Sequence, residues 1–275
     1  MANETPLLSP GNHSSTHLST TLQRQFAAFL IAVQFLTRVP VPADLSGRGP
    51  HSTLLRASVI YFPLVGALVG LATATVILCA SDLWSLGVAV LIGLACEALL
   101  TGALHEDAVA DFCDAFGGGW TREDILRILK DSRVGSFGVV GLTLAIFLRA
   151  GALASIEPSW LLPVIVASAT LGRWVILFVM TILPPVPDRA SLARDVGQQI
   201  RVSELALGSL FAVPGIVVWA FAFPLASVVG VFVLLAIAVG FVRYVRRRIG
   251  GVTGDCLGFI CYVSQVLVLL TATAR

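Results

Sequence analysis

Four acidic residues stand close together in a chain that is otherwise poor in charge: Glu106, Asp107, Asp111 and Asp114. If the preceding apolar stretch continues as a helix, the three aspartates are spaced i, i+4 and i+7 and share one face. Carboxylates on one face repel each other unless a cation neutralises them, and oxygen ligands favour a hard ion, Mg²⁺ or Mn²⁺. The segment therefore predicts an Mg²⁺ site, with the solvated end of a helix as the alternative. Glu106 is the fourth candidate ligand, turned about 100° from Asp107 around the helix.

A second group of charged residues follows, at the entrance of the next apolar stretch. It consists of Lys130, Asp131 and Arg133. Cations beside a metal site neutralise a diphosphate during phosphoryl transfer, so we expect Lys130 and Arg133 to bind substrate. Asp131 is the candidate catalytic acid or base that orients or deprotonates an attacking hydroxyl group.

Two further charged residues are candidates for the same site. Arg173 lies inside an apolar stretch, where an unpaired guanidinium is costly, so it should pair with a substrate phosphate or with Glu97. Asp255 follows a glycine-rich turn at the start of the last apolar stretch. We expect Asp255 to bind substrate, with a helix N-cap as its alternative role.

The composition defines the elements that must position these residues. Hydrophobic residues make up 57% of the 275 residues, charged residues 12%, and the mean hydropathy is +0.91. So few charges cannot cover a soluble surface, and apolar stretches of about 20 residues are long enough to cross a bilayer. The sequence predicts an all-α, polytopic transmembrane bundle and excludes a nucleic-acid-coating protein. Seven spans are expected, at residues 56–80, 83–104, 135–156, 160–183, 205–223, 225–242 and 256–272.

The arginines and lysines predict the orientation of this bundle. Fifteen of the eighteen fall before or at the first residue of the first span, or in the second, fourth and sixth connections, and the other three connections have none. Short cytoplasmic loops carry an excess of these residues, so the acidic segment is expected on the cytoplasmic side. We expect a disordered cytoplasmic tail over residues 1–22, then one transmembrane catalytic domain over 23–275 with a cytoplasmic acidic loop over 105–133. Residues 23–36 have the pattern of an amphipathic helix lying on the membrane.

Several motifs together resemble the adenosylcobinamide-GDP ribazoletransferase (cobalamin synthase) family. They are spread in the family's order over nearly the whole chain. Ala108 and Ala115 stand where the family has glycine, which removes no candidate ligand. The motifs are FLTRVPVP at 35–42, LHEDAVADFCDAFGGG at 104–119, KDSRVGSFG at 130–138, Gly172-Arg173 and GGVTGDCLG at 250–258.

The resemblance implies a magnesium-dependent transferase in the cell inner membrane with its active site facing the cytoplasm. It implies that α-ribazole, or its 5′-phosphate, attacks the cobinamide-linked phosphorus of adenosylcobinamide-GDP. GMP would leave, and adenosylcobalamin or its phosphate would form. The lipid bilayer is a further expected partner, the resemblance also allows contact with other cobalamin-assembly enzymes, and no nucleic acid is expected.

Three alternatives remain at this point. A CDP-alcohol phosphotransferase also acts on a nucleotide diphosphate ester, and Asp111 and Asp114 fit the start of its signature, but the rest does not follow. A prenyltransferase would need a second aspartate-rich motif, where Asp255 stands alone. A metal or solute transporter would explain seven spans and clustered acids, but Glu97 is the one acid at midspan.

Overall fold

The computed structural model describes residues 13–41, 51–186 and 200–274, and all of its named elements are helices. The expected tail falls largely on residues 1–12, which lie outside the described residues. The helices are α1 (His13–Leu36), α2 (His51–Ser58), the 3₁₀ helix η1 (Val59–Tyr61), α3 (Phe62–Ser81), α4 (Leu86–Thr101), α5 (Leu104–Gly118), α6 (Arg122–Ile128), α7 (Ser136–Ser155), α8 (Pro158–Ile182), α10 (Val202–Ala222), α11 (Pro224–Ile249) and α12 (Gly254–Thr271).

Six of the described helices are long and apolar enough to cross a membrane, and the bent pair α4 and α5 makes a seventh candidate span. The predicted all-α, polytopic architecture is therefore confirmed. Most predicted boundaries lie within a few residues of the observed ones, because the length of an apolar stretch sets where a spanning helix begins and ends. The first helix differs more, since α1 begins at His13 rather than at residue 23. The polar turns that precede its apolar part carry no apolar pattern.

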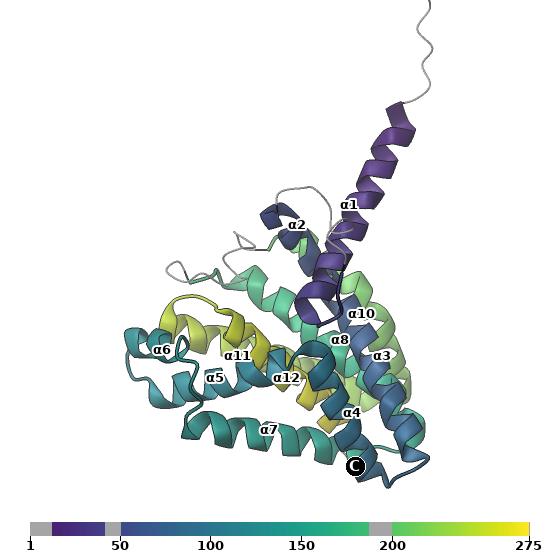
Figure 1. Ribbon diagram of the computed structural model, residues 1–275, viewed down its shortest axis with the longest axis vertical. Coiled ribbons are helices and arrows are strands. Elements are labelled where there is room, and N and C mark those ends of the chain that lie inside the picture. Colours follow the sequence, from purple (N-terminus) through teal and green to yellow (C-terminus); the bar gives the residue numbers. More distant parts are fainter. Residues whose placement is uncertain (1–12, 42–50, 187–199, 275) are drawn as a thin grey trace, which may run out of the picture.

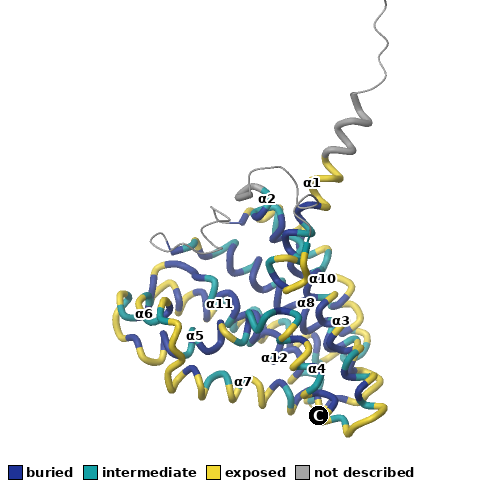
Figure 2. The backbone as a smooth tube through the Cα atoms, viewed as in Figure 1, coloured by how far each residue is buried: buried dark blue, intermediate teal, exposed yellow. Residues whose placement is uncertain are grey.

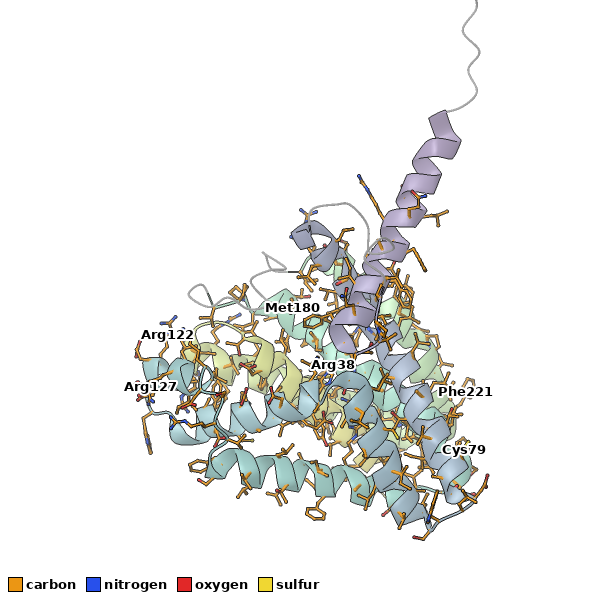
Figure 3. The ribbon with its side chains drawn as sticks, in the orientation of Figure 1. Arg38, Cys79, Arg122, Arg127, Met180 and Phe221 are labelled. Atoms are coloured by element: carbon orange, nitrogen blue, oxygen red, sulfur yellow. The ribbon has the colours of Figure 1, made fainter. Side chains whose placement is uncertain are left out.

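Helix α8 lies at the centre of the bundle, and α3, α10 and α12 pack around it (Figure 1). In the most apolar stretch of α8, 72% of the residues are buried, whereas in that of α7 only 22% are buried. The outer side of α7 is exposed along most of its length (Figure 2). Exposed apolar side chains such as Phe221 point outward from the bundle (Figure 3). In a spanning bundle this outward apolar surface faces lipid.

The two ends of the bundle carry different elements. The C-terminus lies close to the connection between α3 and α4, whereas α1, α2 and α6 lie away from it (Figure 1). Arg122 and Arg127 on α6 project at the far side from this connection (Figure 3). The basic connection that carries α6 thus lies away from the short connection between α3 and α4, which has no lysine or arginine.

Candidate active site

A break in the second span positions the acidic residues. The span does not continue straight into them, because α4 ends at Thr101 and α5 begins at Leu104 at an angle of 88°. The three aspartates still lie on one helix, α5, at the predicted spacing. Gly102 and Ala103 adopt left-handed backbone conformations, with φ of 68° and 55°. Glycine tolerates this region and alanine rarely adopts it. Asp107, the first of the three aspartates, therefore lies one turn into a new helix.

Helix α12 brings a second carboxylate toward this turn. Gly258 of α12 meets Ala108 of α5 so closely that a Cβ at Gly258 would collide with the Ala108 methyl group. Asp255 stands one turn before Gly258, and Asp107 directly precedes Ala108. The alternative role of Asp255 as helix N-cap is not observed, because Thr253 caps α12 and accepts a hydrogen bond from the Cys256 N–H at 3.3 Å. The close contact of two small residues thus sets the two carboxylates at one site.

Asp107 and Asp255 line the same cavity, which has a volume of about 120 Å³ and is open to solvent at its mouth. His105, buried at the start of α5, lines it as well. The rest of the wall is mainly apolar and comes from α1, α3, α8 and the starts of α5 and α12: Phe35, Leu36, Phe62, Leu104, Ala108, Ile176, Gly254, Leu257 and Gly258. A concave, mostly apolar site with a few converging polar groups is typical of small-molecule binding.

This cavity has a donor set that fits Mg²⁺ in its usual mode. Within the described ranges, no three histidine, cysteine or acidic side chains converge as a complete metal-binding group. Mg²⁺ is commonly held by one or two carboxylates and completed by water and substrate phosphates. Asp107 and Asp255 supply that number of carboxylates on one cavity wall. Asp111, half-buried one turn further along α5, is not part of the wall.

Asp114 has a structural partner that the sequence did not indicate. One carboxylate oxygen accepts a hydrogen bond from the Gly135 N–H at 2.6 Å, and the other accepts one from the Gly138 N–H at 2.7 Å. These amides belong to the start of α7, where backbone donors have no partner within the helix. Asp114 therefore caps α7 from α5. Its predicted role as an Mg²⁺ ligand stays a prediction.

The second charged group forms a local ion pair outside the cavity wall. The Arg133 guanidinium donates to Asp131 from Nη2 at 2.7 Å and from Nε at 3.0 Å. This hydrogen bonding, with a further one from the Arg133 backbone, lowers the pKa of Asp131 to about 2. Lys130 and Arg133 are both exposed. None of the three lines the cavity, so their predicted roles in catalysis and substrate binding stay predictions.

A buried charged network lies beside the break in the second span. The partner of Glu97 is Arg149 of α7, whose Nη2 donates to both carboxylate oxygens at 2.8 Å. The suggested pairing of Glu97 with Arg173 is not observed. Instead, the fully buried Arg173 donates from Nη1 to Gln265 Oε1 at 3.0 Å, and its Nε and Nη2 have no hydrogen-bond partner among the described residues. Arg173 is thus left with free donors, and its predicted phosphate contact stays a prediction.

Arg149 also connects this network to the acidic segment. Its Nη1 lies 3.7 Å from Glu106 Oε1. One side chain from α7 therefore contacts both arms of the broken span, Glu97 on α4 and Glu106 on α5. Sequence reasoning missed Arg149, although a charged residue inside an apolar span signals a buried partner. The ion pair with Arg149 gives Glu106 a structural role. Its predicted contact with a metal ion stays a prediction.

Comparison with known proteins agrees with this picture of a membrane bundle that carries an acid-lined cavity. The family model described as Cobalamin-5-phosphate synthase matches residues 28–273. An adenosylcobinamide-GDP ribazoletransferase of Vibrio parahaemolyticus is 35% identical and aligns over 96% of this chain and 98% of its own length. The protein of the same name from Ralstonia pickettii is 37% identical over 90% of this chain and 95% of its own.

A third relative of that name, from Leptothrix cholodnii, is 39% identical over 84% of this chain and 88% of its own. No solved structure matches the chain. The class of protein defined by the fold and the cavity is a polytopic membrane protein with a small-molecule site. More particularly, the chain belongs to the cobalamin-5-phosphate synthase family. The resemblance seen in the motifs is confirmed, and the phosphotransferase and transporter alternatives are not favoured.

Proposed function

We propose that this chain joins adenosylcobinamide-GDP and α-ribazole, or its 5′-phosphate, and releases GMP. The observation that carries the proposal is the cavity in which Asp107 and Asp255 meet, in a chain of this family. A ribose hydroxyl that is free in both α-ribazole and its 5′-phosphate attacks the cobinamide-linked phosphorus, a new P–O bond forms, and the P–O bond to the GMP phosphate breaks. The hydroxyl proton passes to solvent water. Two carboxylates beside a diphosphate suit this reaction only if the charge is compensated.

The proposed cofactor is Mg²⁺, with Asp107 and Asp255 as its protein ligands. Bound there, the ion would neutralise charge that develops on the diphosphate and help to orient its oxygens. The apolar wall of the cavity would shield one side of the diphosphate from water, and the helix contact at Gly258 sets the two carboxylates on one wall. Phosphoryl transfer requires little more of the protein than positioning and electrostatic stabilisation.

Asp131 remains the proposed base, and its low pKa limits how readily it can accept a proton. With a pKa of about 2, it stays ionised throughout the neutral range, because Arg133 stabilises the carboxylate form. General bases are most effective when their pKa lies near the working pH, so Asp131 would take up a proton weakly. Its contribution would then be to orient the hydroxyl group, and its titration would leave the rate unchanged between pH 5 and 8.

The function is tested directly with the purified full-length chain in liposomes. We expect GMP release from adenosylcobinamide-GDP only when α-ribazole and Mg²⁺ are both present, and its loss when EDTA removes the metal. Chromatography of the products should show one adenosylcobalamin for each GMP. GMP release at the same rate without α-ribazole would indicate a hydrolase and would contradict the proposal, as would full activity in EDTA.

We also propose that the chain lies in the inner membrane with the cavity facing the cytoplasm. The distribution of basic residues supports this orientation. In a cysteine-free variant, a cysteine replacing exposed Ser132, between α6 and α7, should resist a membrane-impermeant thiol reagent in intact spheroplasts. The matched variant carries a cysteine at exposed Ser85, between α3 and α4, and should react. The reverse labelling pattern would show the opposite orientation.

A further inference from the structure

The turn that follows α1 is held firmly at the break in the second span. Thr37 Oγ1 donates to the Val33 carbonyl oxygen at 2.7 Å and accepts from the Val39 N–H at 3.2 Å. Between them, the Arg38 N–H donates to the Leu100 carbonyl oxygen, in the last turn of α4, at 2.7 Å. The backbone at Arg38 is therefore fixed to the end of α4. Phe35 and Leu36 of the same motif line the cavity, but Arg38 has no role in the site described so far.

The side chain of Arg38 lies directly over Gly102. A Cβ at Gly102 would collide with the guanidinium at Nε and would lie 2.9 Å from Cζ and 3.0 Å from Nη2. Gly102 also has a φ of 68°, a backbone conformation that favours glycine. Both this conformation and the nearby guanidinium therefore disfavour any residue with a Cβ. Figure 3 shows Arg38 where the end of α1 meets the top of α4. The guanidinium thus sits at the break itself.

This position is at the rim of the cavity. Phe35 and Leu36, which directly precede the turn, line the cavity, and so does Leu104, two residues after Gly102. Asp107 lies one turn further along α5. Arg38 is exposed, and within the described ranges its guanidinium has no carboxylate partner. A guanidinium held in place from its backbone but left with open donors is suited to bind an incoming anion.

The charges of the cavity show why such a cation is needed. Its wall carries the two carboxylates Asp107 and Asp255 and no lysine or arginine. The cations expected from the sequence lie elsewhere, because Arg133 pairs with Asp131 and Arg173 is fully buried against Gln265. A diphosphate substituted at both ends carries two negative charges and the two carboxylates add two more, so one divalent ion would compensate the total only in part. Planar, bidentate donors match phosphate oxygens better than a point charge does.

We propose that Arg38 binds the diphosphate of the nucleotide substrate at the rim of this cavity. Gly102 leaves the space in which the guanidinium lies. This inference rests on the proposed function for the identity of the nucleotide ester, but the charge argument applies to any diphosphate. The motif at residues 35–42 then supplies a cation at the rim of the cavity, next to Phe35 and Leu36 of its wall.

The test compares variants of the full-length chain in liposomes. Arg38→Ala should raise KM for adenosylcobinamide-GDP, or lower kcat/KM for it, by about 10- to 100-fold, the usual effect of losing a hydrogen-bonded charge. KM for α-ribazole should stay unchanged. Arg38→Lys should recover part of the loss, because it restores the charge without the bidentate geometry. The matched control is Arg24→Ala, an exposed arginine on the same helix, far from the cavity, which should behave like the wild type.

A second measurement does not depend on the proposed reaction. Titration of the purified protein with inorganic pyrophosphate in the presence of Mg²⁺ should show binding that Arg38→Ala weakens about tenfold or more and Arg24→Ala preserves. If the wild type released no GMP, the proposed function would fail, while this titration would still decide the role of Arg38. Unchanged KM and pyrophosphate affinity in Arg38→Ala would overturn the inference, as would absence of pyrophosphate binding to the wild type. Should Arg38→Ala not fold, Arg38→Gln decides by the same criteria.

Discussion

Replacing Asp107 with asparagine is expected to lower the rate of GMP release by more than about 100-fold while folded protein still accumulates in the membrane. Asparagine keeps the size of the side chain but removes the negative charge that holds the metal, and losses at metal sites reach at least this magnitude. Asp107 is exposed to the cavity, so the change leaves no buried group without a partner. The rate should be measured over a range of Mg²⁺ concentrations, because a lost ligand raises the Mg²⁺ requirement.

Three companion variants sharpen this test. Asp255→Asn should have an effect of the same order, since Asp255 supplies the second carboxylate of the cavity. Glu123→Gln is the matched control, because this acid is 78% exposed on α6 and outside the cavity. Asp114→Asn should lower thermal stability more than Asp107→Asn does, by about 1–2 kcal/mol, because it disturbs the cap of α7. If Asp107→Asn kept both its rate and its Mg²⁺ dependence, the cavity would not be the metal site.

The helices were predictable from the sequence because bilayer thickness imposes a length that apolar stretches must match. The break between α4 and α5 was not predictable. It depends on Ala103 adopting a positive φ, which alanine rarely does, so residue type gave no signal for it. Gly102 alone is an ambiguous signal, since glycine also occurs within transmembrane helices.

The site was predictable in its residue types and only partly in its geometry. Asp107 was predicted as a metal ligand and Asp255 as a substrate-binding residue, and the structure places both on one cavity wall. Their meeting depends on Gly258 packing against Ala108, a contact between segments far apart in the sequence. Asp114 has the same residue type as Asp107, yet its oxygens accept backbone hydrogen bonds from the start of α7. Spacing on one helix shows which carboxylates share a face, and the neighbouring helices decide what each of them contacts.

The charged residues inside the spans also have partners that spacing along the sequence could not predict. Glu97, Arg149 and Arg173 all stand in apolar stretches, so each was certain to need polar partners. Helical spacing could not decide which arginine would meet Glu97, because that depends on the rotation of α7 and α8 about their axes. In the structure Arg149 meets Glu97, and Arg173 is held by Gln265.

Replacing Arg149 with methionine is therefore expected to lower the free energy of unfolding by about 3–5 kcal/mol, because Glu97 would remain buried without its cation. Both side chains are only 4% exposed. Unfolding in mixed micelles with increasing SDS measures the change. The matched control is Arg127→Met, whose partner Asp124 lies at 3.3 Å and whose pair is 72% and 41% exposed. That variant should lose only about 0–1 kcal/mol, since water screens an exposed pair.

The double variant Arg149→Met with Glu97→Gln separates the contribution of this pair to the stability of the bundle from its contribution to the position of the site. Removing both charges leaves only the partly exposed Glu106 without its cation, so part of the lost stability should return. Activity should not return to the same extent. Arg149 also contacts Glu106, and through Glu97 and Glu106 it ties α4 to α5 across the break that sets the position of Asp107. A double variant that regained wild-type stability and wild-type kcat together would show that the pair only stabilises the bundle and does not position the site.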